Sequence, residues 1–324
     1  MVRMRKIITG ALMLLIVAAL LISSYYPNPG YASHADEEWY AFGKDQHRTR
    51  DSLDTSSVPP LEFKWKLEGI GWSISQSVMD KNFIYHIAGG YLYKIPLALG
   101  FYDWEAPLTE ILKDFKALGG DSIKISEDPN VRSHPTIDNI YSSAGPRIYA
   151  GTGDGKVVKI NPANMQILRE YNAGVEVINA PTVLGDDLIT FGGVDSMIYV
   201  AKGNKMSRIE FNPDGHSSAE ITGTYSQLPD VNGHPVFVVP VNYKSTDKAG
   251  YVGAFEVIDN GEGNAPTIKR LWMYKTDNGV AASITYDARK HRVYFADKSG
   301  AVYALNASNG QLVWKNTKFR SSSA

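Results

Sequence analysis

Short runs of alternating apolar and polar residues, separated by turns rich in Gly, Asp and Asn, recur along most of the chain. Residues 84–85 lead through a turn to residues 90–95, and residues 188–191 lead in the same way to residues 196–200. Two β-rich runs joined by a turn of this composition predict a β-hairpin.

A further strand is expected before each hairpin, and another after it. Residues 133–136, 179–182 and 233–236 mark the preceding strand, and each has proline at its third position. The following strand is clearest at residues 269–274 and 311–315. The predicted unit is therefore four strands long.

This unit repeats within the sequence. Residues 147–166 align without gaps with residues 292–311, and Arg, Tyr, Gly, Val, Asn and Gln fall at matching positions. Four strands repeated about every 40 to 55 residues are typical of propeller blades. The pattern predicts an all-β chain, a β-propeller of four-stranded antiparallel blades, with five complete blades and the start of a sixth.

The two ends of the repeat region do not match each other. Residues 63–67 have the character of an outer fourth strand, yet they precede the first complete blade. The last complete repeat already has a fourth strand around Trp314, and residues 319–324 resemble the first strand of another blade. We therefore expect an incomplete ring, truncated at its C-terminal end, in which at least one more blade belongs to the natural propeller.

Residues 107–118 depart from the strand pattern and predict a helix inserted between the first two blades. Pro107 can begin the helix, and Gly119 with Gly120 can end it. The apolar residues at helical spacing favour packing on the propeller itself, with partner binding as the alternative. Those residues are Leu108, Ile111, Leu112, Phe115 and Leu118.

The N-terminus has the order of a secretory signal. Arg3, Arg5 and Lys6 are followed by an uncharged apolar run over residues 7–22 and then by small residues up to Ala35. An uncleaved membrane anchor is the alternative, whereas a lipoprotein anchor is excluded because the chain has no cysteine. We expect an exported protein, secreted or held at the cell surface, with three parts: a signal peptide or anchor (residues 1–35), an opening segment (residues 36–62) and propeller repeats (residues 63–324).

Composition narrows the possible functions. Lys and Arg number 33 against 34 Asp and Glu, and a net charge of −1 argues against a nucleic-acid partner. Hydrophobic residues make up 44% and charged residues 21%, which is typical of a folded globular protein. The absence of cysteine removes disulfides, thiolate metal sites and cysteine nucleophiles.

The last repeat resembles a known family. Residues 304–315, Ala-Leu-Asn-Ala-Ser-Asn-Gly-Gln-Leu-Val-Trp-Lys, resemble the tryptophan-docking repeat of pyrroloquinoline-quinone-type propellers. Residues 39–49, followed by residues 59–66, resemble the way such domains begin. The resemblance covers residues 39–324, and it implies that the docking tryptophans pack on a neighbouring blade and have a structural role. The docking residues it assigns are Trp65, Trp272 and Trp314.

The resemblance leaves the activity open. The family includes quinoprotein dehydrogenases, an outer-membrane assembly lipoprotein and secreted proteins that bind no quinone. Its enzymes use a calcium ion, a catalytic carboxylate and typically a disulfide between adjacent cysteines, which this chain cannot supply. No residue here matches the calcium ligands or the catalytic Asp, so no catalytic, cofactor-binding or metal residue is assigned. Arg169 stands where the second repeat would have its docking Trp.

Three motifs that could carry chemistry have simpler explanations. Residues 151–156 look like a phosphate-binding loop, but a strand follows them instead of a helix, so they are predicted to form a hairpin turn. His134 and His234 share one predicted repeat position in the second and fourth blades, where packing is favoured over a shared metal because blades two apart rarely bring both rings to one ion. Carboxylates in predicted turns usually bond nearby backbone N–H groups; these are Asp154, Asp186, Asp187 and Asp195.

The sequence favours a non-catalytic extracytoplasmic propeller that acts as a binding or assembly scaffold. The expected partner is a protein or a cell-wall polymer, without any cofactor, and membrane contact would come only through an uncleaved N-terminal segment. The first alternative is a dehydrogenase that depends on pyrroloquinoline quinone and calcium and whose site is completed beyond residue 324. The second alternative is a damaged gene product without activity of its own.

Overall fold

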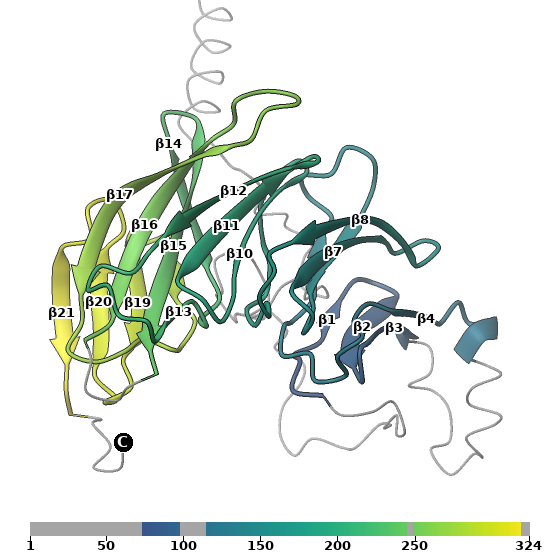
Figure 1. Cartoon of the computed structure of the whole chain (residues 1–324), viewed down its shortest axis with the longest axis horizontal. Helices are drawn as coiled ribbons and strands as arrows, with labels where there is room; N and C mark the ends of the chain where they lie inside the picture. The colour runs from purple at the N-terminus through teal and green to yellow at the C-terminus, as the bar shows by residue number, and fades with distance from the viewer. Residues whose placement is uncertain (1–72, 98–114, 245–248, 319–324) are drawn as a thin grey trace, which may run out of the picture. The chain divides into compact units, whose positions relative to one another are not determined.

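The computed structural model describes residues 73–97, 115–244 and 249–318, in which five antiparallel sheets follow one another along the chain (Figure 1). The first sheet has the strand order β1-β2-β3-β4 and the second the order β5-β6-β7-β8. Their strands are β1 (Val78–Met79), β2 (Phe83–Ala88), β3 (Tyr91–Pro96), β4 (Asp121–Lys124), β5 (Thr136–Asp138), β6 (Arg147–Gly151), β7 (Lys156–Asn161) and β8 (Gln166–Asn172).

The third and fifth sheets repeat this simple order, and the fourth modifies it. In the fourth sheet β13 and β14 both pair with β15, so two short strands share one side of a long one. The strands are β9 (Thr182–Gly185), β10 (Leu188–Gly192), β11 (Met197–Lys202) and β12 (Lys205–Glu210); β13 (Ala219–Glu220), β14 (Ser226–Val231), β15 (His234–Tyr243), β16 (Tyr251–Ile258) and β17 (Thr267–Lys275); and β18 (Thr285–Asp287), β19 (Arg292–Ala296), β20 (Val302–Asn306) and β21 (Leu312–Asn316).

The hydrophobic core lies between successive sheets. Tyr149 of the second sheet packs in one cluster with Phe191 of the third, and Val238 of the fourth packs in another with Phe295 of the fifth. Val, Ile, Tyr and Phe form these strands because branched and aromatic side chains fit a pleated surface that is covered on both faces. Each sheet is therefore stabilised by its neighbours.

The fourth strands of the second, fourth and fifth sheets share one irregularity. In each of these sheets the pairing of the fourth strand with the third shifts its register at one point. The fourth-strand residues next to this shift are Arg169, Trp272 and Trp314. These three residues pair with Lys159, Ala254 and Ala304. The predicted equivalence of Arg169 with the docking tryptophans thus has a counterpart in the register.

The all-β prediction and the predicted architecture are confirmed. The five sheets are antiparallel propeller blades, four of them four-stranded and the fourth with the additional short strand β13, and they do not form a closed ring within the residues that the structure describes. We number them blades 1 to 5 in chain order.

One strand assignment was wrong. Residues 233–236 were expected to form the first strand of blade 4, but His234 begins β15, the second strand, and β14 provides the first. Asn232 and Gly233 have φ angles of 52° and 77° and form a two-residue hairpin turn between β14 and β15. Asn-Gly is the preferred sequence for such a turn because both residues tolerate positive φ.

Several predictions concern residues outside the described ranges. These are the signal or anchor segment, the opening segment, the strand containing Trp65, and residues 319–324. Of the helix predicted at residues 107–118, only residues 115–118 are described, and residues 115–117 are helical. Directly after these helical residues, the N–H of Gly120 donates a hydrogen bond to the carbonyl of Phe115.

Within the described ranges, no helix has the length and apolar character that crossing a membrane requires.

Candidate functional site

The segments just before the first strands of the blades are joined by hydrogen bonds from a backbone N–H of one blade to a side chain of the next. Gln76 N–H donates to His134 Nδ1 at 2.7 Å, Ala180 N–H to Thr224 Oγ1 at 3.3 Å, and Thr224 N–H to Ser283 Oγ at 3.3 Å. We call these contacts, together with the hydroxyl contacts between blades described below, the inner belt.

The inner belt has a second level, made by hydroxyl groups two residues further along. Thr136 Oγ1 donates to the carbonyl of Pro181 at 2.7 Å, and Thr182 Oγ1 donates to that of Tyr225 at 3.5 Å. Both threonines are fully buried. These hydroxyls therefore connect neighbouring blades.

His134 and His234 are not equivalent, contrary to the sequence prediction. His134 lies just before β5, the first strand of its blade, and its Nδ1 is occupied by the N–H of Gln76. His234 lies after the first strand of blade 4, at the hairpin into β15. The described part of the chain holds no group of three or more His, Asp or Glu side chains placed to bind a metal ion.

The third and fourth strands make a second series of joints, from one blade to the turn between the third and fourth strands of the next. Trp272 Nε1–H donates to the carbonyl of Ala307 at 2.9 Å, and a Cβ added to Gly310 would lie 2.5 Å from its ring. Lys94 Nζ donates to the carbonyl of Pro162 at 2.8 Å, and Ser207 Oγ to that of Pro266 at 2.5 Å. Different side chains thus make equivalent joints.

The predicted docking residues differ in their surroundings. Trp272 is buried against blade 5, whereas Trp314 is 39% exposed and contacts Tyr294 of its own blade, with ring centroids 6.0 Å apart. Trp65 lies outside the described residues. A shared docking role for the three tryptophans stays a prediction.

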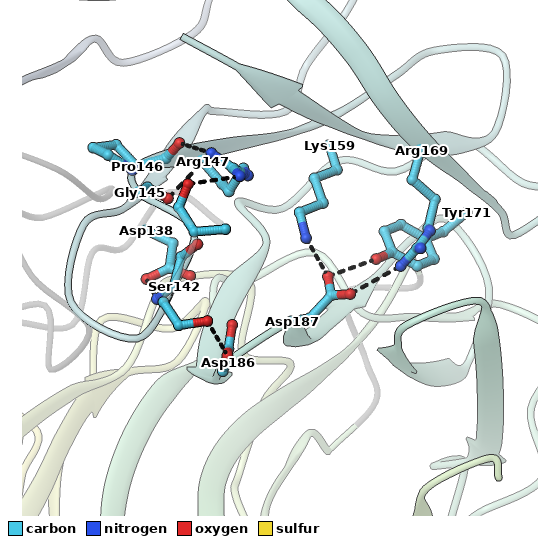
Figure 2. A network of polar contacts seen from close by, with 12 residues as sticks. Asp138, Ser142, Gly145, Pro146, Arg147, Lys159, Arg169, Tyr171, Asp186 and Asp187 are labelled. Carbon is cyan, nitrogen blue, oxygen red and sulfur yellow. Dashed lines mark hydrogen bonds and ion pairs between the residues drawn. The ribbon is translucent and has the colours of Figure 1, made fainter. Parts of the chain in front are cut away.

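The joint between blades 2 and 3 is ionic. Lys159 Nζ lies 2.5 Å from Oδ1 of Asp187, and Arg169 Nη1 lies 2.8 Å from Oδ2 (Figure 2). Partial burial disfavours the charged carboxylate, but the hydrogen bond and charge of Lys159, with those of Arg169, outweigh it and lower the pKa of Asp187. Burial and the same carboxylate raise the pKa of the Tyr171 hydroxyl to about 12. Arg169, in the register position of a docking Trp, therefore makes its joint by charge.

Beside this joint, residues 139–146 form a loop between β5 and β6, which we call the blade 2 loop. Asp138 precedes it, and its Oδ1 accepts hydrogen bonds from the N–H groups of Ile140, Tyr141 and Ser142 at 2.9 to 3.3 Å. Arg147 follows it, and its guanidinium donates to the carbonyls of Ala144, Gly145 and Pro146 at 2.7 to 3.2 Å (Figure 2). The backbone N–H groups at the start of the loop and the backbone carbonyls at its end therefore both have hydrogen-bond partners.

Asp138 is itself buried, with an exposed fraction of 2%. Burial raises the pKa of its carboxyl group even though the three N–H groups oppose that shift. Its Oδ2 has no hydrogen-bond partner, and neither has the hydroxyl of Tyr149, which shares the same face of the sheet. The site can therefore hold and orient the loop.

The sequence did not single out Asp138 or Arg147. The available signal was the stretch Asn139–Pro146, which is rich in Ser and Gly and longer than the corresponding turns of blades 3 and 4. An acid before such a stretch and an arginine after it are common, so only the register shows that they act together.

The fold and these joints define a β-propeller of pyrroloquinoline-quinone-type repeats. Residues 128–323 match the family described as outer membrane protein assembly factor BamB, and the chain belongs to this family. No curated protein sequence matches the chain significantly.

Solved structures resemble the chain at low sequence identity. One is a quinohemoprotein alcohol dehydrogenase, ADHIIG, from Pseudomonas putida HK5, with 14% identity and a TM-score of 0.46; the match covers 88% of this chain and 40% of the other. BamB from Moraxella catarrhalis has 12% identity and a TM-score of 0.40, with 76% of each chain covered. Sqt1 from Saccharomyces cerevisiae has 16% identity and a TM-score of 0.42, covering 58% of this chain and 48% of the other. The chain thus spans less than half the length of the dehydrogenase.

Proposed function

We propose that this chain is a non-catalytic propeller outside the cytoplasm that binds other proteins as an assembly scaffold. The proposal rests on one observation, which is that the reactive side chains are used in contacts between blades. The inner hydroxyls, the His134 ring and the Asp187 carboxylate are all engaged in joints between blades. The loops remain as the surfaces on which a partner can bind.

The description of the family indicates which class of partner to propose. Because that description names an outer membrane protein assembly factor, we propose that the partners are envelope proteins during their assembly. Under this proposal residues 1–35 direct export as a cleaved signal or an anchor, residues 36–62 lead into the propeller, and residues 63–324 form its repeats.

Two measurements on the full chain test the scaffold. In the first, pyrroloquinoline quinone and calcium are titrated into the purified protein while tryptophan fluorescence is recorded. We expect no saturable quenching, and tight saturable binding would overturn the proposal in favour of a quinone-dependent dehydrogenase.

The second measurement is chemical cross-linking in intact cells, followed by fractionation. We expect discrete cross-linked protein products in an extracytoplasmic fraction. Products that contain only cell-wall polymer would replace the protein partner with a polymer, and recovery only from the cytoplasm would contradict the proposed location.

A further inference from the structure

The blade 2 loop is an insertion relative to its counterparts. It has residues 139–146 between the first two strands of its blade, whereas blades 3 and 4 use the two-residue turns 186–187 and 232–233 at the same place. A turn of two residues is sufficient to connect these strands. The additional residues therefore serve a purpose other than connection.

The loop is fixed on three blades. Asp138 and Arg147 secure its two ends on blade 2, and Ser143 Oγ donates to Asp186 Oδ2 of blade 3 at 3.0 Å. Tyr141 packs against the core cluster between blades 2 and 3, and its hydroxyl donates to Gln227 Oε1 of blade 4 at 3.2 Å. A surface that is held in place before binding loses little conformational freedom when a partner arrives.

This rigid loop presents an apolar side chain to solvent. Ile140 is 49% exposed, although its own N–H is held by Asp138 and the next residue, Tyr141, packs inward. Val231, at the end of β14, is 38% exposed and lies on the same strand as Gln227, which accepts the hydrogen bond of the Tyr141 hydroxyl. Exposed apolar groups held on a rigid frame are typical anchor points of protein interfaces.

The rim of this surface is acidic. Asp186 and Asp230 are both exposed to solvent. The nearby cations have other partners: the guanidinium of Arg147 is directed to the carbonyls of the loop, and Lys159 and Arg169 bind Asp187. Acidic groups around an apolar centre favour a partner with basic groups around an apolar side chain.

We propose that Ile140, Tyr141 and Val231, rimmed by Asp186 and Asp230, form a docking surface for a protein segment with an apolar residue flanked by lysine or arginine. This inference rests on the proposed scaffold function and names its binding surface and the class of partner. The surface spans the face of blades 2, 3 and 4 at which their first two strands are connected.

The test uses the full chain and a defined probe, a fluorescent peptide with a central leucine flanked by two lysines on each side. We expect Ile140→Ala to weaken binding by about fivefold or more, as for the loss of an apolar contact at an interface centre. The matched control is Ile74→Ala, because Ile74 is also 49% exposed but lies on blade 1. Equal affinities for the two variants would overturn the proposal, as would the absence of binding to the unmodified chain.

Charge is tested with the same probe. Asp186→Asn and Asp230→Asn should each weaken binding and reduce its dependence on salt, while Asp121→Asn, an exposed acid on β4, should change neither. A peptide with glutamate in place of lysine should not bind, and equal binding of the two peptides would refute the surface. If cross-linking still finds protein partners after the peptide test has failed, the scaffold stands and only this surface is wrong.

Discussion

Asp138 and Arg147 are direct register partners across β5 and β6, and together they hold the loop that runs between them. The carboxylate accepts hydrogen bonds from the first N–H groups of the loop, and the guanidinium donates to its last carbonyls. Neither residue needs the other as an ion-pair partner, because each satisfies backbone groups of one kind. Opposite charges at the two ends of one loop thus fix its conformation.

We expect Asp138→Ala to lower the free energy of unfolding by about 2 kcal/mol, because three backbone N–H groups lose their acceptor in a partly buried position. Asp138→Asn keeps an acceptor oxygen and should cost about 1 kcal/mol less than the alanine variant. Urea unfolding at neutral pH measures both. Equal losses for the two variants would show that the carboxylate does not act by capping the loop.

The tryptophans of blades 4 and 5 should differ in their contribution to stability. Trp272→Phe removes an indole N–H that bonds the Ala307 carbonyl, so we expect a loss of about 1 kcal/mol, and Trp272→Ala should cost about 3 to 5 kcal/mol. Trp314→Phe is the matched control at the same register position, and because Trp314 is 39% exposed its loss should stay below about 0.5 kcal/mol. Thermal and urea unfolding of the three variants give the comparison. A loss for Trp314→Phe as large as that for Trp272→Phe would contradict it.

The repeat alignment located blades 2 and 5 well, because their hairpins have the same length and place residues 147–166 in register with residues 292–311. Blade 4 was misread at its start, since Pro235 resembles Pro135 in local sequence while the Asn232-Gly233 turn moves it to the second strand. Local similarity was therefore reliable only where the turns agreed.

The contacts between blades were harder to predict than the blades. The docking role of Trp272 was predicted from a family resemblance, whereas the roles of Asp138 and Arg147 depend on a strand register that no local pattern reveals. The same holds for Asp187, whose partners come from two strands of another blade. Residues that act across a sheet or between sheets carry no spacing signal in the sequence.

The same substitution should have different effects on a threonine of the inner belt and on Thr222, which lies outside it. Thr136→Val keeps the shape of the side chain but removes the hydroxyl that donates to the Pro181 carbonyl, so we expect a loss of about 1 kcal/mol. The hydroxyl of Thr222 is buried without a hydrogen-bond partner, so Thr222→Val should be neutral or slightly stabilising. Urea unfolding of the two variants compares the same chemical change in both settings. The belt would lose its assigned role if Thr136→Val were as harmless as Thr222→Val.

The ionic joint between blades 2 and 3 should make stability depend on pH in a defined direction. The pKa of Asp187 in the folded chain lies below its ordinary value of 3.8, because Lys159 and Arg169 outweigh the effect of burial. A lowered pKa in the folded state means that the stabilisation is fully present above the unfolded value and is lost as the pH falls through the folded one. The unmodified chain should therefore exceed Asp187→Asn in stability at pH 7, and this difference should shrink below about pH 4. Urea unfolding at pH 7 and at pH 3 measures the difference, and the exposed Asp121→Asn serves as the control that should show little change at either pH. If the difference between the unmodified chain and Asp187→Asn grew as the pH fell, the carboxylate would not be stabilised by its two cations.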